Sequence, residues 1–533
     1  MIKKIAKQLK KDDVQFKLMF WFLVLQPFLD CFLLYSDEII SIFKFSPTTL
    51  IRLFFIGFLG LIVFTKDKSK KNKIIIISYM IFIGIYTIIH HIYTSDLNIV
   101  GYDEFYYSVT TEFLYILRML LPIGILYMSY QIKFKKEDFI RVVKYTLAVV
   151  SFIIIVLNIF EKSLSSYSGG WGYILGNIFD WFSGNYEEYN LSSKGWFNSA
   201  NQISGLFMLL FPFAVYDLFD EFDYKKLINI TASIIAMVML GTRVSVYGWI
   251  LVLILIVAID IFMIIFYKHK FRKKTYISSL IVLSFGLFLV NYAPIYSEDM
   301  QEIFNENDRK ADNIIKETVY YSKKIKNNEL DEQEKKEVLK TYRCLHENGD
   351  YETSCLVTLQ SIGPAFYKTI YPVDEHEDFW LYFLLEVPIE QRFGQRNIQK
   401  IIASDINNNQ KDKFTPILGL GYSRFIRVGL YPEHDFYVHS LTIGIVGIIL
   451  LILIYPVISV ASLIYMLIKK KFNFLNLLLS AVILEVCALS YVTGHIMDEL
   501  IVTLFLGFIS GFLLKRTFET NNEITKTNKI HKK

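Results

Sequence analysis

The sequence predicts an all-α polytopic membrane protein with about twelve transmembrane helices, and three observations support this fold class. Hydrophobic residues make up 53% and aromatic residues 16% of the 533 residues, and the mean hydropathy is +0.38, which is higher than in an ordinary soluble protein. Apolar runs long enough to cross a bilayer recur along the chain. Lysine and arginine collect in alternate connections between these runs, as is typical of membrane proteins.

The apolar runs are counted against the roughly 20 residues that a transmembrane helix needs. The first follows a basic N-terminal segment and has no small-residue cleavage site, so we expect a retained span rather than a signal peptide. The tenth is over-long, which indicates either a kink at Pro456 or first turns that stand outside the bilayer. The expected spans lie near residues 16–35, 47–65, 74–93, 106–130, 142–160, 198–218, 227–243, 245–267, 276–293, 440–467, 473–492 and 498–514.

The distribution of basic residues predicts the orientation. The short connections on one side carry 32 lysines and arginines, and those on the other side carry 4. This bias places both termini in the cytoplasm, and an even number of spans agrees with it. Two longer connections, residues 161–197 and 294–432, then lie on the outer side.

We expect the chain to divide into four parts. Residues 1–293 hold helices one to nine, 294–432 form a large, mainly helical extracytoplasmic loop, 433–514 hold helices ten to twelve, and 515–533 form a basic cytoplasmic tail. The first half of the large loop combines helix formers with i,i+4 charge pairs, so surface helices are expected there. Its charge runs are typical of a solvated face.

The four cysteines are too few for a disulfide scaffold. Cys344 and Cys355 both fall in the large outer loop, where the compartment permits a disulfide but the spacing does not prove one. Cys31 and Cys487 fall within apolar runs, so we expect them to be small buried residues.

A charged cluster stands where the large loop meets the tenth span. Glu433, His434 and Asp435 directly precede the apolar run, and Arg424 and Arg427 lie a few residues earlier. Charged groups at a membrane entrance carry a large desolvation cost, which favours a functional reason for their presence. We therefore expect the working site of the protein at this boundary.

Arginines from distant segments favour a phosphate ligand. Arg243 ends the seventh span on the outer face, and Arg392 and Arg396 lie in the loop segment EQRFGQRN. A guanidinium grips two oxygens at once and keeps its charge, so several of them beside a membrane would suit a lipid diphosphate. The alternative is that loop arginines, Arg424 and Arg427 among them, pair with the loop's many acids.

The remaining charges and motifs indicate less. His90 and His91, at the outer end of the third span, are given no role, and the acidic segment 374–378 is typical of a solvated cluster rather than a metal site. The GLGY segment lacks the third glycine of a dinucleotide fingerprint, and no basic-aromatic pattern suggests nucleic acid. Structural ion pairs or snorkelling side chains are the expected role of Asp30, Arg52, Glu112, Arg118, Asp260 and Glu485.

Four segments resemble those of a known family. They are QPFLD at 26–30, KGWFNSANQISGLFMLLFP at 194–212, GTRVSVYGW at 241–249, and the region from EQRFGQR through GLGY to EHDFYVHSLTIGIVG. With the layout of spans and the single large outer loop, they resemble the O-antigen ligase and polymerase superfamily of lipid-linked glycan enzymes, also called Wzy-like or WaaL-like proteins. The resemblance implies a GT-C-like membrane glycosyltransferase that uses no metal and no cofactor.

The resemblance also implies roles for single residues. Arg243 matches the family arginine that follows Gly-Thr or Gly-Ser at the end of a span. Arg396, or else Arg392, matches the loop arginine that precedes the GxGY turn, here residues 419–422. With Arg424 and Arg427, these are the candidate diphosphate-binding residues. Further candidates for binding substrate come from the second segment, Lys194 and Asn201.

A departure from the family pattern concerns the proposed catalytic base. In ligases of the family, a His followed by Asn, Ser or Gln stands at a fixed distance before a GxxG motif. Here GxxG is residues 444–447, and that register places Glu433 where the His would be and His434 next to it. The sequence is in this respect similar to a polymerase-like branch of Gram-positive bacteria, in which an acid occupies that place.

The implied reaction is glycosyl transfer on the outer face of the bacterial cytoplasmic membrane. A glycan on a polyprenyl diphosphate is the donor, and a hydroxyl of an acceptor repeat unit attacks its anomeric carbon while the arginines neutralise the departing diphosphate. Glu433 is the expected general base, with His434 in reserve. Flippase and chain-length regulator proteins are the implied protein partners.

Two alternatives stay open. A ligase of the same family would move finished glycan onto a wall polymer, a lipid or a protein. A lipid-linked oligosaccharide flippase would share the even number of spans, but a transporter should show two halves with matched interrupted helices. The large loop between spans nine and ten makes this chain lopsided, which favours the enzyme. The sequence identifies neither the sugars nor the acceptor.

Overall fold

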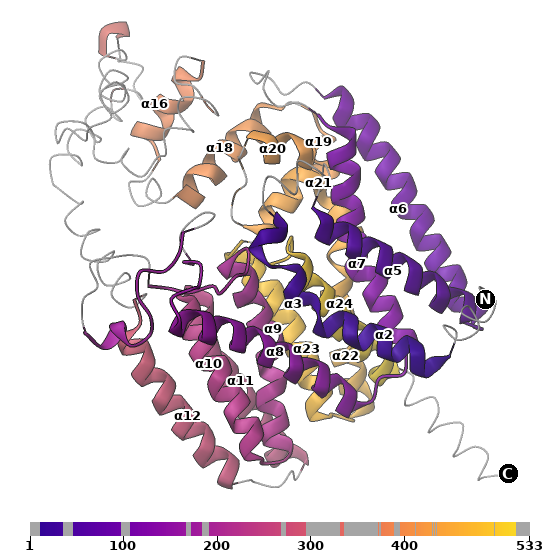
Figure 1. Cartoon of the computed structure of the whole chain (residues 1–533). Coiled ribbons are helices and arrows are strands. Elements are labelled where there is room, and N and C mark those ends of the chain that lie inside the picture. The colour runs from indigo at the N-terminus through magenta and orange to yellow at the C-terminus, as the bar shows by residue number, and fades with distance from the viewer. Residues whose placement is uncertain are drawn as a thin grey trace. The chain divides into compact units, whose positions relative to one another are not determined.

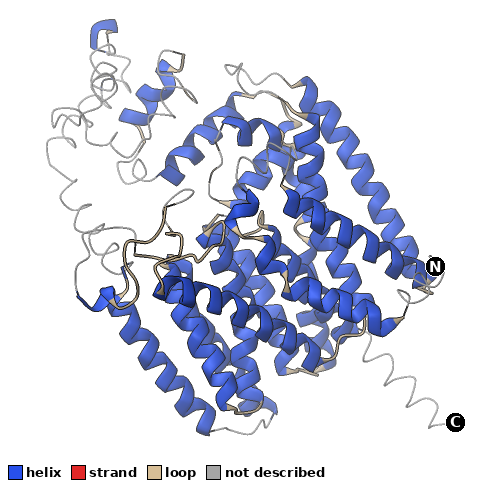
Figure 2. Ribbon diagram, viewed as in Figure 1, coloured by secondary structure: helices blue, strands red, loops and turns tan. Residues whose placement is uncertain are grey.

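The computed structural model describes residues 11–35, 46–97, 107–166, 172–183, 191–267, 273–294, 324, 331–334, 371, 375–387, 395–410, 412–428, 430, 432, 434–494 and 496–518. Within these residues every regular element is helical, apart from three isolated bridges between single residue pairs. Figure 2 shows the same pattern, with helices joined by loops and turns and no strand among the described residues. The predicted all-α fold class is therefore confirmed.

Ten helical segments of the described chain are long and apolar enough to cross a membrane. This confirms a multi-pass membrane protein. One of the ten is the continuous stretch of α21 and α22. The segments are α5 (Pro47–Lys66), α6 (Lys70–Asp96), α7 (Val109–Gln131), α8 (Lys136–Ile159), α9 (Ala200–Asp220), α11 (Arg243–Tyr267), α12 (Lys273–Tyr292), α21 (Asp435–Leu451) with α22 (Ile454–Lys469), α23 (Phe474–Val492) and α24 (Leu500–Phe518).

Two of the twelve expected spans form shorter helices. The first consists of α2 (Asp12–Val24) and α3 (Gln26–Leu29), interrupted at Leu25. The seventh is α10 (Tyr224–Leu240), which begins where the Asp223 side chain accepts a hydrogen bond from the Lys225 backbone amide and ends at Gly241, with φ +67°. A capping acid at the start and a glycine with positive φ at the end are common at helix termini. Together they limit α10 to 17 residues.

The over-long tenth span is interrupted near Pro456. Helix α21 ends at Leu451 and α22 begins at Ile454, so Pro456 falls in the first turn of the second helix. Proline has no backbone N–H to donate and is tolerated at the start of a helix, where that donor would have no intrahelical acceptor. This interruption agrees with the kink that the sequence predicted.

The chain divides into two compact units, each built from segments that are distant in sequence. Unit 1 consists of Met1–Ile83, Ile116–Glu298 and Ile449–Lys533, and unit 2 of Gly84–Tyr115 and Asp299–Ile448. Helices α6, α7 and α21 contribute residues to both. The predicted four-part division, which follows chain order and sidedness, stays a prediction.

Helix α9 forms the centre of unit 1. Its membrane-length portion is 100% buried by protein, and α8, α10, α11, α23 and α24 pack against it, as can be followed in Figure 1. Phe207, Phe211 and Phe213 are fully buried there. A helix that is apolar on all sides suits such an enclosed position.

Unit 2 holds the described parts of the large loop and the segments that frame them. Its elements include α16 (Glu377–Leu385), α18 (Gln395–Asn409), α19 (Thr415–Leu418) and α20 (Tyr422–Val428), followed by the start of α21. The C-terminal turns of α6 and the N-terminal turn of α7 belong to the same unit. The segment expected to carry surface helices in the first half of the loop lies almost wholly outside the described residues.

Candidate functional site

A buried polar cluster in unit 1 joins the first two family-like segments. Arg52 on α5 forms an ion pair with Asp30, and its Nε donates a hydrogen bond to Gln26 Oε1 at 2.7 Å. The second carboxylate oxygen of Asp30 accepts a hydrogen bond from Gln202 Nε2 on α9 at 2.8 Å. All four side chains are 0% exposed. Because each charge is paired and hydrogen-bonded, the cluster fixes the 26–30 segment to the start of α9.

Backbone and side-chain contacts bring the family-like segment 241–249 close to the first two segments. The Asn198 amide donates to the Asp30 carbonyl at 2.9 Å and the Ser193 amide to the Met239 carbonyl at 2.7 Å. The Ser204 and Thr242 hydroxyls are 2.6 Å apart. Three segments that the resemblance singled out, 26–30, 194–212 and 241–249, therefore meet within unit 1.

Three of the predicted substrate-binding residues lie on these segments. Arg243 is the first residue of α11, and its side chain is exposed. Lys194 is buried, and burial lowers the pKa of its ammonium group. Asn201 is the second residue of α9 and is half-buried. Unit 1 thus groups Arg243, Lys194 and Asn201 on neighbouring segments, while their role in binding stays a prediction.

In unit 2, two glycines interlock the GLGY turn with the break in α21. Gly419 has φ +82° and ψ 176°, and Gly444 has φ +65° and ψ 178°, a region open essentially to glycine alone. A Cβ at Gly419 would lie 2.3 Å from the Thr442 carbonyl oxygen, and a Cβ at Gly444 would lie 2.4 Å from that of Ile417. Because neither glycine has a Cβ atom, the two backbone segments approach each other more closely than any other residue type would allow.

Hydrogen bonds hold this interlock in register. The Leu420 amide donates to the Leu441 carbonyl at 2.7 Å, and the Gly421 amide to the Thr442 carbonyl at 2.9 Å. The break at Gly444 frees the Ile443 carbonyl from the helix ladder, and Tyr86 Oη donates to it at 2.7 Å. The first of the GxxG glycines and the GxGY turn thus form one structural element.

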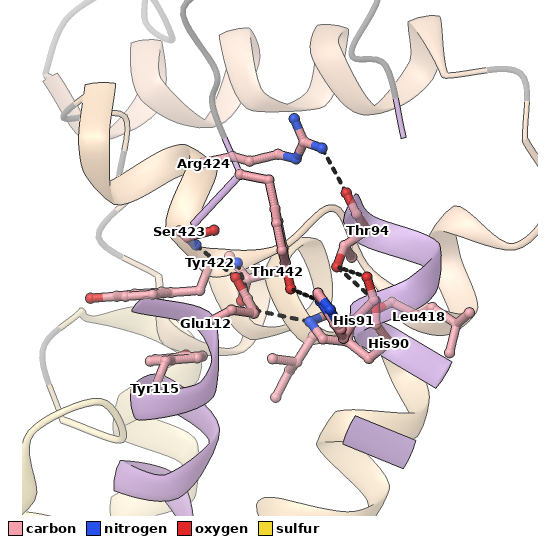
Figure 3. Close-up of polar contacts among 12 residues, drawn as sticks. His90, His91, Thr94, Glu112, Tyr115, Leu418, Tyr422, Ser423, Arg424 and Thr442 are labelled. Atoms are coloured by element: carbon pink, nitrogen blue, oxygen red, sulfur yellow. Dashed lines mark hydrogen bonds and ion pairs between the residues drawn. The ribbon is translucent and has the colours of Figure 1, made fainter. Parts of the chain in front are cut away.

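A buried acid and imidazole support the same turn from the opposite side. Glu112 accepts hydrogen bonds from the Tyr422 amide at 3.1 Å and the Ser423 amide at 2.9 Å, which caps the first turn of α20. His90 Nε2 lies 2.9 Å from Glu112 Oε1, and His90 Nδ1 lies 2.8 Å from the Leu418 carbonyl oxygen. Figure 3 shows His90 and Glu112 beneath the turn, from α6 and α7. His90 is 0% and Glu112 2% exposed.

Arg424 ties α20 to the end of α6. Its Nη2 donates to the Thr94 carbonyl at 2.6 Å and to the Leu97 carbonyl at 2.7 Å, and its guanidinium lies over the Tyr107 ring at 5.6 Å. Figure 3 shows the side chain turned toward Thr94. Burial lowers the pKa of Arg424, and Glu112 opposes that shift. A cation at the C-terminal carbonyls of a helix is favourable, so this arginine has a structural task; its predicted diphosphate contact stays a prediction.

Aromatic contacts complete the cluster toward α21. Tyr115 stacks on Tyr422 with ring centroids 3.7 Å apart, and its hydroxyl lies 2.7 Å from His439 Nδ1. His434 directly precedes α21, where its carbonyl accepts a hydrogen bond from the Val438 amide at 2.9 Å. Asp435, the next residue, is 2% exposed.

Several predicted residues cannot be compared with the structure. Arg392 and Glu433 lie outside the described residues, as do Cys344 and Cys355. Arg396 falls within α18 and Arg427 within α20, but their side chains are outside the described part. The predicted roles of these residues and the candidate disulfide stay predictions.

The sequence alone missed that His90 and Glu112 pair with each other and hold the GLGY turn. It gave His90 no role and indicated a structural charge for Glu112, because each stands alone in an apolar run. The available signal was that an acid and an imidazole occur in consecutive apolar helices, where a lone ionisable group would be costly. Among the described residues, no group of three or more His, Cys, Asp or Glu side chains could hold a metal ion.

Comparison with known proteins gives one match. A family model described as "O-antigen ligase like membrane protein" matches residues 12–519, nearly the whole chain. Neither the curated proteins nor the solved structures contain a match.

Proposed function

Because the chain belongs to the family of O-antigen ligase like membrane proteins, we propose that it is a polysaccharide polymerase. It transfers a glycan from a polyprenyl-diphosphate carrier to a hydroxyl of an acceptor repeat unit. The family supports a membrane enzyme that acts on lipid-linked glycans, and the described helices suit a multi-pass protein. The charge bias of the connections supports a reaction on the outer face of the cytoplasmic membrane.

One observation carries the choice of polymerase, namely the register between the acid and the GxxG motif. Gly444, the first glycine of that motif, has its backbone interlocked with that of Gly419. In the register that the family resemblance implies, counted back from this motif, Glu433 stands where a ligase would have His. An acid in place of the imidazole favours the polymerase-like branch.

In the proposed mechanism, Glu433 accepts the proton of the acceptor hydroxyl. The hydroxyl oxygen forms a bond to the anomeric carbon while the bond between that carbon and the diphosphate oxygen breaks. The negative charge that develops on the leaving diphosphate is stabilised by Arg243 and by Arg396 or Arg392, with Arg424, Arg427, Lys194 and Asn201 as further contacts. His434 is the reserve base.

A carboxylate at this position can serve as a base near neutral pH. Partial burial at the membrane boundary disfavours the charged form and raises the pKa of a carboxyl group. Asp435, two residues beyond Glu433, is almost fully buried, so the start of α21 offers such surroundings.

A ligase is the second candidate, and the family description, which names a ligase, favours it. It would move finished chains onto a wall polymer, a lipid or a protein. The two candidates use the same donor and differ in the acceptor and in the number of transfers per chain.

Deleting the gene and sizing the surface glycan tests the proposal. Single repeats left on the lipid carrier are the result expected for a polymerase. Full-length chains stranded on lipid would overturn the polymerase in favour of the ligase. Repeats trapped inside the cell would overturn both and indicate a flippase.

A further inference from the structure

A cavity of about 730 Å³ lies between α16 and α18 in unit 2. This volume falls within the range of roughly 300–1,000 Å³ that is common for small-ligand sites. The cavity is not formed by the GLGY turn, the interlocked glycines or the His90–Glu112 pair. It therefore requires an explanation of its own.

The wall formed by α18 is mainly polar, with Ile401 as its one apolar side chain among the described lining residues. Asn397, Ser404 and Asn408 line the cavity, and their spacing of seven and then four residues places them on one face of the helix. Another face carries Ile398, Ile402 and Ile406, which are all fully buried. Helix α18 is thus amphipathic, and its amide and hydroxyl groups are turned into the cavity.

The wall formed by α16 is aromatic. Phe379 and Tyr382 both line the cavity. Phe379 is buried, whereas the Tyr382 side chain is 53% exposed. An exposed ring on an otherwise polar cavity offers a flat apolar surface with one hydroxyl, which suits a ligand that is apolar on one face and polar at its edges.

Asp405 adds a fixed acceptor to the lining. Its Oδ2 accepts a hydrogen bond from Tyr371 Oη and another from Asn409 Nδ2 at 3.1 Å. Its Oδ1 accepts no hydrogen bond from the described part of the chain. Burial raises the pKa of this carboxyl group. The group is therefore held in place with one oxygen available to a ligand hydroxyl.

The cavity wall is fastened to the helix that follows the proposed catalytic acid. Tyr437 Oη donates to Ser404 Oγ at 3.0 Å, and Lys400 Nζ lies over the Tyr437 ring at 5.7 Å. Tyr437 is in the first turn of α21 and three residues beyond His434. A ligand in the cavity would thus lie on the same rigid part of unit 2 as the start of α21.

We propose that this cavity binds the glycan of the lipid-linked substrate, at sugars beyond the one that reacts. Sugar rings present C–H groups on one face and hydroxyls at the edge, which matches the Tyr382 ring opposite the Asn397, Ser404, Asp405 and Asn408 groups. The described lining contains one cation, Lys400, and one acid, Asp405. That balance does not suit a diphosphate, and the polar wall does not suit a lipid chain.

The inference rests on the proposed function for the identity of the ligand, and binding can be measured apart from catalysis. The experiment uses the full-length protein in lipid nanodiscs. The probes are oligosaccharides of one and of six repeat units, released by partial hydrolysis from the cell's own surface polysaccharide. The variants are Tyr382→Ala, which removes the exposed ring, and Asn408→Ala, which removes an exposed amide. Phe414→Ala removes a comparably exposed ring that does not line the cavity and serves as the control.

We expect Tyr382→Ala to weaken binding of the six-repeat probe about tenfold, and Asn408→Ala about threefold. The modal chain length of the polymer should shorten in both, and the transfer rate should fall more for a glycan of six repeats than for a glycan of one repeat. Phe414→Ala should behave as wild type in every measurement. A merely structural role would lower the transfer rate equally for both glycan lengths.

Unchanged binding and unchanged chain length in both cavity variants would overturn the inference and leave the proposed function intact. Conversely, a wild-type protein that binds the six-repeat probe in the cavity but never elongates it when the lipid-linked donor is supplied would overturn the polymerase and leave the cavity assignment standing. If neither the wild type nor any variant binds the probes, the cavity is not a glycan site.

Discussion

Each unit contains a buried carboxylate that is paired with a basic side chain. The type of basic residue differs between the two pairs. In unit 1 the partner of Asp30 is an arginine, which keeps its charge at any physiological pH. In unit 2 the partner of Glu112 is a histidine, whose two ring nitrogens contact Glu112 and the Leu418 carbonyl. The first pair suits a fixed joint between segments. The second pair holds the backbone of the GLGY turn.

The surroundings of the two pairs sharpen this contrast. Asp30 and Arg52 are surrounded by side chains, Gln26 and Gln202, which complete their hydrogen bonds. Glu112 and His90 instead bond to backbone groups of residues 418–423. Loss of either side chain of the pair in unit 2 would therefore act directly on the backbone of the GLGY turn.

The largest effect on elongation is expected when one charged side chain of the proposed site is removed. Arg243→Ala and Glu433→Gln should each abolish elongation, a loss of at least about a hundredfold in rate, because transition-state charge is left without its partner. Polymer length on gels and transfer by purified protein measure it. Arg141→Ala, whose side chain is 54% exposed, is the control. Wild-type chain lengths in either variant, at normal membrane levels, would remove the site assignment.

Breaking the arginine pair should produce the largest loss of stability. Asp30→Asn leaves the Arg52 charge buried without a counter-charge, at a cost of about 3–5 kcal/mol, measured as thermal unfolding in detergent. The double variant with Arg52→Gln should recover part of it, because no charge is then left unpaired. Asp12→Ala, which breaks the exposed pair with Lys66, should cost at most about 1 kcal/mol. Equal losses for both pairs would contradict the fixed-joint interpretation.

Separating the interlocked backbones of unit 2 should come next. Gly419→Ala forces a methyl group to within 2.3 Å of a carbonyl oxygen at a disfavoured φ, at a cost of at least about 2 kcal/mol. Gly84→Ala on α6, where a Cβ meets nothing within 4 Å, should be neutral or slightly stabilising. Proteolysis of the 417–444 region and thermal unfolding measure both. A stable Gly419→Ala protein with normal elongation would show that the interlock is dispensable.

Removing the charge of the histidine pair should have the smallest effect on stability. Glu112→Gln keeps the shape of the side chain and one acceptor at the start of α20, so we expect a loss of only about 1–2 kcal/mol. Glu137→Gln, exposed in the first turn of α8, is the control in thermal unfolding. A loss as large as that of Asp30→Asn would mean that the two pairs contribute alike to stability.

The helices could be predicted from the sequence because an apolar run in a membrane has to satisfy its own backbone. The residues at which these helices end or break were harder to predict. The short α10 depends on Asp223 and Gly241 at its ends. The break in α21 depends on the close approach of Gly444 to the carbonyl of residue 417. Sequence periodicity carries no information about such a tertiary contact.

The sequence predicted the candidate site from the types of its residues. It did not show which partners the side chains of these residues contact. Guanidinium chemistry singled out Arg424 for phosphate, but its hydrogen bonds go to carbonyls of Thr94 and Leu97, some 330 residues away in the chain. His90 and Glu112 were undervalued for the same reason, since their pairing arises from how α6 and α7 pack. Arg243, Lys194 and Asn201 were singled out because a family-like segment contains each of them, and their role in binding stays a prediction.

The complete enclosure of α9 has a consequence for biogenesis. Helices α23 and α24 pack against α9, yet the ribosome makes them more than 250 residues after it. Until these helices are made, the flank of α9 that will contact them, which carries Gly205 beside Val502 and Tyr216 beside Phe474, is covered only by lipid or by the translocon. The protein can finish folding only when its last helix has been inserted, so a nonsense codon shortly before α23 should yield a chain that quality-control proteases remove.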